Sequence, residues 1–192
     1  MQSQTFLGDV EPYQQRRPYT CGAAALKAVS KHWGRDFDEL ALADLIGVDP
    51  TRGSTTDQVA TAARRLGYTA WPHEFASTDE LRRYTARDVP VIIAVRSFTR
   101  PNQGHFVVAT EIDEDTVEIM DPNVPGNRRT LSRVELDRRW QFRDRAGVIV
   151  MPQGRPRGGL GTAREPRPWV PFALAGLVAA MGTAVVIMYQ RR

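Results

Sequence analysis

Three segments before Gly67 repeat apolar side chains at the spacing of an α-helix. The first predicted helix begins at Cys21 and ends at about His32 or Trp33. The apolar positions of the three segments are Leu26, Val29 and Trp33; Leu40, Ala43 and Ile46; and Val59, Ala62, Ala63 and Leu66. Each stripe predicts a helix with one buried face. This part of the chain is therefore expected to form a small helical lobe.

Residues that start and stop helices bound these segments. Asp36 with Glu39 three positions later resembles a capping box, and Thr55 with Gln58 repeats that signal. The three helices are expected to end at Gly34, Gly47 and Gly67, because glycine readily takes the left-handed conformation that closes a helix.

After the helical lobe the pattern changes to short apolar runs typical of β-strands. Val91–Val95 is a continuous apolar run with β-branched residues, as expected of a central strand. Further strands are expected over 68–73, 104–112, 116–120 and 147–151, and short helices after Ser77 and Ser132. Runs of helices followed by runs of strands indicate an α+β fold rather than an alternating α/β fold.

The chain divides into three predicted parts. Residues 1–152 form the folded domain, and residues 153–168, rich in Gly, Pro and Arg, form a flexible linker. Residues 169–189 are uncharged and apolar, and about 20 such residues suffice to cross a bilayer. We expect a single-pass membrane helix, with a hydrophobic helix docked on protein as the alternative. Four Arg precede this segment and two follow it, which favours a cytoplasmic folded domain.

Composition narrows the possible partners and the compartment. The chain has 26 basic and 22 acidic residues; removing six Arg and one Glu from 153–192 leaves 20 and 21 for residues 1–152. The folded part therefore lacks the basic excess of a nucleic-acid-binding domain, and nucleic acid is not an expected partner. One Cys cannot form an internal disulfide, which fits a reducing compartment. The N-terminus does not resemble a secretory signal.

Cys21 is the only cysteine and would stand in the first turn of the first helix, with Thr20 able to cap that helix. The free N–H groups and the dipole of a first turn favour negative charge. A thiol placed there loses its proton more easily, and the thiolate is the nucleophile. Gly22 would let a substrate carbonyl approach the backbone closely. A buried structural cysteine is the alternative.

A predicted hairpin carries the second candidate group. A turn at 113–115 would place residues whose numbers sum to about 226 opposite one another, which pairs His105 with Asp121. A carboxylate on one ring nitrogen orients the imidazole and leaves the other nitrogen facing a nucleophile. Cys, His and Asp are the parts of a cysteine hydrolase triad. Taken singly, His105 can also be a structural strand residue and Asp121 a turn residue.

Other polar residues complete the candidate chemistry. A side-chain amide can stabilise an oxyanion, and Gln15 lies six positions before Cys21; Gln14 competes with it, and spacing does not decide between them. His32 and His73 lack a carboxylate partner in the sequence and are expected to be structural or surface groups. One Cys and three dispersed His give no metal-ligand set, so no metal or other cofactor is expected.

These motifs resemble those of papain-like cysteine peptidases that process bacteriocin precursors after a double glycine. The matching positions, within about residues 10–152, are Gln15, Cys21-Gly22-Ala23-Ala24, Gly104-His105-Phe106-Val107-Val108 and Asp121-Pro122. The resemblance implies a papain-like fold in which Cys21 is the nucleophile and His105 the general base and acid. It also implies that Asp121 orients His105 and that Gln15 completes the oxyanion hole. Family members often have an acidic residue where this chain has Thr20.

We predict a membrane-anchored cysteine peptidase that hydrolyses a peptide bond in a peptide or protein; the resemblance implies small residues at the cut. Many such peptidases are the first domain of a peptide-exporting ABC transporter, so a transporter partner would here be a separate chain. Two alternatives stay open: a non-catalytic domain that binds a leader peptide, and a related acyl transfer or deamidation. Gly158 and Gly159 suggest self-cleavage, but a loose linker explains them better.

Overall fold

The computed structural model describes residues 10–124 and 126–154. Three helices open this part of the chain, as the apolar spacing predicted: α1 Cys21–His32, α2 Glu39–Ile46 and α3 Thr56–Arg65. Leu26, Val29 and Val59 on their inner faces are fully buried. The expected helical lobe is therefore present, with its apolar faces turned inward.

Local signals fixed most of the helix ends, but two expected caps are wrong. The Thr55–Gln58 capping box is formed, and Gly47 closes α2 in the left-handed conformation. The N-cap of α2 is Asp38, whose side chain accepts from two backbone N–H groups, and not Asp36. Thr20 occupies the N-cap position of α1 but makes no side-chain capping bond. Its hydroxyl donates to the carboxylate of Glu39 instead.

All strands pair antiparallel in one six-stranded sheet of order β1-β6-β2-β3-β4-β5. The strands are β1 Tyr68–Glu74, β2 Val91–Arg96, β3 Gly104–Ile112, β4 Thr116–Met120, β5 Arg128–Ser132 and β6 Ala146–Pro152. Sequence reasoning missed β5, because its residues Arg-Arg-Thr-Leu-Ser contain no apolar run. The predicted central strand β2 does lie inside the sheet, and Val91 to Val95 are all buried.

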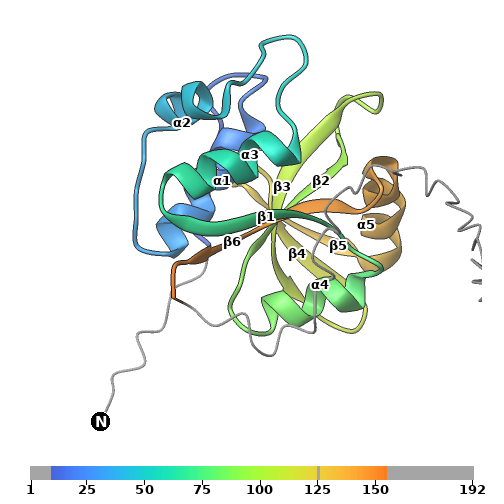
Figure 1. The fold of residues 1–192 in the computed structure, drawn as a ribbon. Helices are drawn as coiled ribbons and strands as arrows, with labels where there is room; N and C mark the ends of the chain where they lie inside the picture. Colours follow the sequence, from blue (N-terminus) through green and yellow to red (C-terminus); the bar gives the residue numbers. More distant parts are fainter. Residues whose placement is uncertain (1–9, 125, 155–192) are drawn as a thin grey trace, which may run out of the picture. The chain divides into compact units, whose positions relative to one another are not determined.

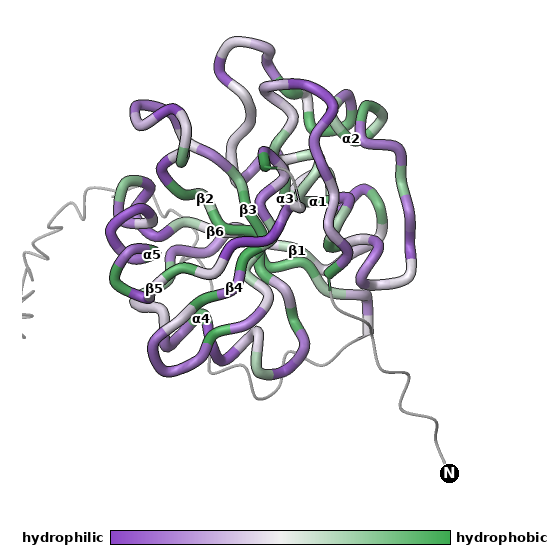
Figure 2. Tube along the Cα trace, turned by 180° about the vertical axis from the view of Figure 1, so that it is seen from behind, coloured by the Kyte–Doolittle hydropathy of each residue, from purple (hydrophilic) through white to green (hydrophobic). Residues whose placement is uncertain are grey.

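Helices cover both sides of the sheet. Figure 1 shows α1, α2 and α3 gathered on one side, and α4 (Thr78–Thr85) and α5 (Arg133–Trp140) on the other. Ser77 and Ser132 cap α4 and α5 as predicted, and a short 3₁₀ helix, η1 (Gln141–Arg143), follows α5. In Figure 2 the hydrophobic stretches gather along the central strands, between these two groups of helices. The α+β class is confirmed.

The hairpin of β3 and β4 forms, but its predicted register is wrong. Val108 lies opposite Met120, so paired numbers sum to 228, and the sum becomes 229 beyond an irregularity between Ala109 and Glu111. A β-bulge adds one residue to one strand and shifts the pairing. Asp121 therefore follows the end of β4 and is not directly opposite His105.

The expected membrane segment over 169–189, and all but the first two residues of the expected linker, lie outside the described residues. Within 10–124 and 126–154, no helix is both long enough and apolar enough to span a bilayer.

Candidate active site

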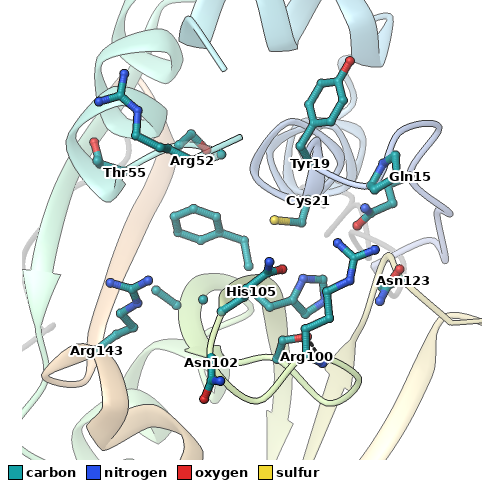
Figure 3. A pocket seen from close by; sticks show the side chains of 18 of the residues that line it. Gln15, Tyr19, Cys21, Arg52, Thr55, Arg100, Asn102, His105, Asn123 and Arg143 are labelled. Carbon is teal, nitrogen blue, oxygen red and sulfur yellow. Dashed lines mark hydrogen bonds between the residues drawn. The ribbon is translucent and has the colours of Figure 1, made fainter. Parts of the chain in front are cut away.

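A cavity of about 530 Å³ opens at the start of α1. Its lining comes from the segment before α1, the loop between α2 and α3, the loop between β2 and β3, and η1. Figure 3 shows Cys21 and His105 at its centre, with Gln15 and Asn123 beside them. The first residue of α1 and the second residue of β3 therefore meet in one cavity, although 84 positions separate them in the chain.

Cys21 begins α1 and is partly buried. Burial acts to raise the pKa of its thiol. Hydrogen bonding to His105, the imidazolium charge, and the backbone N–H groups of Phe106 and Gly22 outweigh burial and lower that pKa. The site therefore favours the nucleophilic thiolate.

His105 lies between the sulfur and a carboxylate. Its Nε2 is 2.7 Å from Oδ1 of Asp121, so Nδ1 is the ring nitrogen left for Cys21. Burial acts to lower the pKa of His105, but hydrogen bonds to Asp121 and Cys21 and their negative charges raise it to about 9. Together with the lowered pKa of Cys21, this raised pKa favours a thiolate facing an imidazolium.

Asp121 is fully buried and makes three polar contacts. Its Oδ1 accepts from His105 and from the backbone N–H of Asn123 at 2.9 Å, and Oδ2 accepts from Arg129 Nε at 2.8 Å. Burial acts to raise the pKa of this carboxyl, but His105, the Asn123 N–H and Arg129 hold it below its usual value. The carboxylate stays charged and can hold the imidazole in one orientation.

Arg129 was missed by sequence reasoning. It belongs to β5, the strand that the apolar pattern did not reveal, and its guanidinium lies 4.4 Å from the centre of the Phe98 ring. Only the pairing of β5 with β4 brings it to Asp121. No sequence signal distinguishes it from the many other arginines of the chain.

The structure separates the two candidate glutamines. Gln15 lines the cavity with Cys21, whereas Gln14 is exposed and does not. Gln15 Nε2 donates to the carbonyl of Arg17 at 2.7 Å, and its backbone N–H donates to the Pro122 carbonyl at 2.9 Å. A side-chain amide carries two hydrogens on nitrogen, so one remains for an oxyanion.

His32 and His73 lie outside the cavity, as expected, but the reason given for them is wrong. Each has a carboxylate neighbour: His32 Nε2 is 3.6 Å from Asp88 Oδ1, and His73 Nε2 is 2.9 Å from Glu80 Oε1. These pairs form only through the fold. In the part of the chain that the structure describes, no three His, Cys, Asp or Glu side chains gather as a metal site would require.

Comparison with known proteins identifies the family. The model of the peptidase C39 family matches residues 9–151. This chain belongs to the peptidase C39 family. The C39 domain is accordingly a cysteine-type peptidase domain, and the resemblance read from its motifs is confirmed.

Curated relatives of the C39 domain include two much longer proteins. The lactococcin-G-processing and transport ATP-binding protein LagD of Lactococcus lactis subsp. lactis is 26% identical over 141 residues, which are 73% of this chain and 18% of that protein. The pediocin PA-1 transport/processing ATP-binding protein PedD of Pediococcus acidilactici is 24% identical over 132 residues, 69% of this chain and 17% of that protein. The chain thus spans less than a fifth of these relatives' length.

Solved structures show the same papain-like fold. The peptidase domain of Streptococcus ComA, a bi-functional ABC transporter, superposes with a TM-score of 0.65 at 22% identity, covering 75% of this chain and 99% of that one. A double glycine motif protease from an AMS/PCAT transporter, solved with its leader peptide, gives 0.56 at 23% identity, covering 76% and 94%.

Sequence reasoning also gave Glu39 a role that the structure does not show. Glu39 is fully buried rather than part of a capping box. Its carboxylate accepts from Tyr13 Oη at 2.9 Å, from the Arg16 N–H at 3.0 Å and from Thr20 Oγ1 at 2.5 Å. Tyr13 and Arg16 flank Gln15, and Thr20 precedes Cys21. The carboxylate therefore anchors the segment that carries both of these residues in the C39 domain.

Gly22 has a packing role that sequence reasoning did not include. A Cβ atom at this position would stand 2.6 Å from Ser54 Oγ and 3.2 Å from Phe106 Cδ2. The missing side chain lets α1 approach the α2–α3 loop and β3.

Proposed function

We propose that the C39 domain hydrolyses a peptide bond through an acyl-enzyme formed on Cys21. The observation that carries this proposal is that Cys21 and His105 line one cavity, with His105 hydrogen-bonded to the buried carboxylate of Asp121 at 2.7 Å. The thiolate attacks the substrate carbonyl carbon and forms a C–S bond. Nδ1 of the imidazolium then gives its proton to the leaving amine as the C–N bond breaks. His105 next takes a proton from water, which attacks the thioester and releases the acid and the thiol.

Two further groups assist these steps. The negative oxygen that forms during attack is stabilised by the free amide hydrogen of Gln15 and by the backbone N–H of Cys21, in the first turn of α1. Asp121 keeps Nε2 of His105 occupied, so Nδ1 alone exchanges protons with the substrate. In this role Asp121 orients the imidazole and does not itself take a proton.

We further propose that the substrate is a leader-bearing peptide cut after small residues. The support is the family, together with the similarity to LagD and PedD, which are processing and transport proteins, and to a double glycine motif protease solved with its leader peptide. Residues 169–189 would anchor the protein as a membrane helix with the C39 domain in the cytoplasm, a proposal that rests on their apolar composition and on the four Arg before and two Arg after them.

The first test is the reactivity of the thiol. Iodoacetamide should label Cys21 faster than free cysteine at pH 7, and His105→Ala should abolish this advantage. Labelling no faster than free cysteine would overturn the proposed nucleophile.

Product analysis separates hydrolysis from its alternatives. Turnover of a double-glycine peptide in H₂¹⁸O should place ¹⁸O in the new C-terminal carboxylate, because water resolves the thioester. Acyl transfer would give an amide product without that label. A domain that only binds would show no turnover in the parent and equal binding in Cys21→Ala.

A further inference from the structure

Three arginines surround the reacting groups: Arg52, Arg100 and Arg143 all line the cavity that holds Cys21. They come from three separate segments. Arg52 lies in the loop between α2 and α3, Arg100 in the loop between β2 and β3, and Arg143 in η1. Asp144 is the one carboxylate of the described lining. This local excess does not reflect overall composition, because residues 1–152 contain 20 basic and 21 acidic residues.

Within the described part of the chain, two of these arginines have no acidic partner. Arg52 lies 3.3 Å from Asp49, but no ion pair joins Arg100 or Arg143 to an acid within the described ranges. Other arginines of the domain, such as Arg133 and Arg145, are paired with carboxylates. The cavity therefore keeps positive charge that the protein does not neutralise.

Arg143 is held in place without an ion pair. Its guanidinium carbon lies 5.1 Å from the centre of the Phe142 ring. A Cβ atom on Gly104 would stand 2.8 Å from two of its nitrogens, so the guanidinium lies directly against the residue that precedes His105. A cation fixed by an aromatic face and a glycine is oriented for a ligand.

The arginines lie on both sides of the nucleophile. In Figure 3, Arg52 and Arg143 are on one side of Cys21, and Arg100 is on the other, near His105 and Asn123. A cavity with one sign of charge and low-dielectric walls concentrates ligands of the opposite sign. An extended peptide that passes Cys21 would meet a guanidinium before and after the bond that is cut.

We infer that the substrate of the C39 domain carries carboxylates on both sides of its cleavage site, which bind Arg143 and Arg100. This inference rests on the proposed peptidase function and deepens it by naming the charge of the substrate. Glu or Asp side chains satisfy a guanidinium fork with two parallel hydrogen bonds. Small residues at the cut and acidic residues around it therefore define the expected substrate class.

The experiment separates binding from turnover. The full chain bearing Cys21→Ala is immobilised and exposed to a mixture of decapeptides with Gly-Gly at the centre and Ala, Leu, Lys, Gln or Glu at each flanking position. The retained peptides are read by mass spectrometry. At about 50 mM salt, Glu should exceed Gln by about threefold or more, the gain expected of a partly exposed charge pair. At about 0.5 M salt that preference should fall towards parity.

Matched variants assign the preference to the cavity. Arg100→Gln and Arg143→Gln together should bring Glu and Gln to parity. Arg65→Gln removes an exposed arginine of α3 that does not line the cavity, and it should leave the preference intact. Equal retention of Glu and Gln, no retention of any peptide, or a preference that survives the double variant would overturn the inference.

The same mixture given to the unmodified protein tests the proposed function separately. Cleavage without a preference for acidic peptides would support the proposed peptidase function and refute the inference that the substrate is acidic. Acid-selective retention without any cleavage would support the acidic ligand and refute the peptidase.

Discussion

Replacing Glu39 by Gln should both destabilise the domain and impair catalysis, although Glu39 touches no substrate. The carboxylate accepts from three donors, on Tyr13, Arg16 and Thr20, in a fully buried position. In Gln, one of the two acceptor oxygens becomes an NH₂ group that faces those donors. The hydroxyl that donated to that oxygen must turn and accept from the NH₂ group instead, and the bonds to the remaining oxygen lose their charge assistance.

The expected size follows from these bonds. Replacing a charged acceptor by a neutral amide weakens each of the three bonds by about 1 kcal/mol. Glu39→Gln should therefore lower the unfolding free energy by about 2–4 kcal/mol, a large share of the ~5–15 kcal/mol that stabilises a typical domain. Because Gln15 lies between two of the anchored residues, kcat/KM of the folded variant should also fall at least about tenfold.

Urea unfolding followed by fluorescence measures the stability, and peptide turnover well below the unfolding midpoint measures the activity. Asp36→Asn is the matched control, because Asp36 lies three residues earlier, is largely exposed and pairs only with the Lys27 ammonium and not with the segment before α1. Asp36→Asn should leave the unfolding free energy and the peptide turnover equal to those of the parent protein within experimental error. A Glu39→Gln variant as stable and as active as Asp36→Asn would refute the anchoring role.

Three further predictions follow from the site. Because the pKa of Cys21 is lowered and that of His105 is raised to about 9, the ion pair exists between these two values. The peptidase rate should therefore fall above pH 9 as the imidazolium loses its proton, and fall on the acid side as the thiolate gains one, with the acid limb below the ordinary pKa of a thiol; both limbs are measurable as a pH profile of kcat/KM. Arg129→Gln should lower the unfolding free energy by about 1–3 kcal/mol, because the buried carboxylate oxygen it binds loses its charged partner; an unchanged urea midpoint would contradict this. Gly22→Ala should cost about 1–3 kcal/mol through the 2.6 Å approach to Ser54, and adding Ser54→Gly should restore part of that loss, whereas an equally unstable double variant would place the strain elsewhere.

The chain's local patterns determined the helices, the α+β class and the candidate groups of the site. Apolar spacing placed α1, and capping residues such as Thr55 and Ser132 bounded their helices, because these signals act within three or four residues. The start of α1 marked Cys21 as an activated thiol for the same reason. His105 and Asp121 were paired correctly although the register used to pair them was wrong. The hairpin brought them close enough for hydrogen bonding in either register.

Only the tertiary structure decided between nearby residues that the local sequence does not distinguish. Gln15 faces the cavity and Gln14 does not, because the backbone bond to Pro122 fixes which of them points inward. Glu39 is a buried anchor because it binds Tyr13 and Thr20, which lie 26 and 19 positions earlier in the chain. Arg129 binds Asp121, which lies 8 positions earlier. Such contacts depend on how strands and segments are paired in space. A sequence supplies the donors and acceptors, but burial and pairing in the fold choose which of them meet.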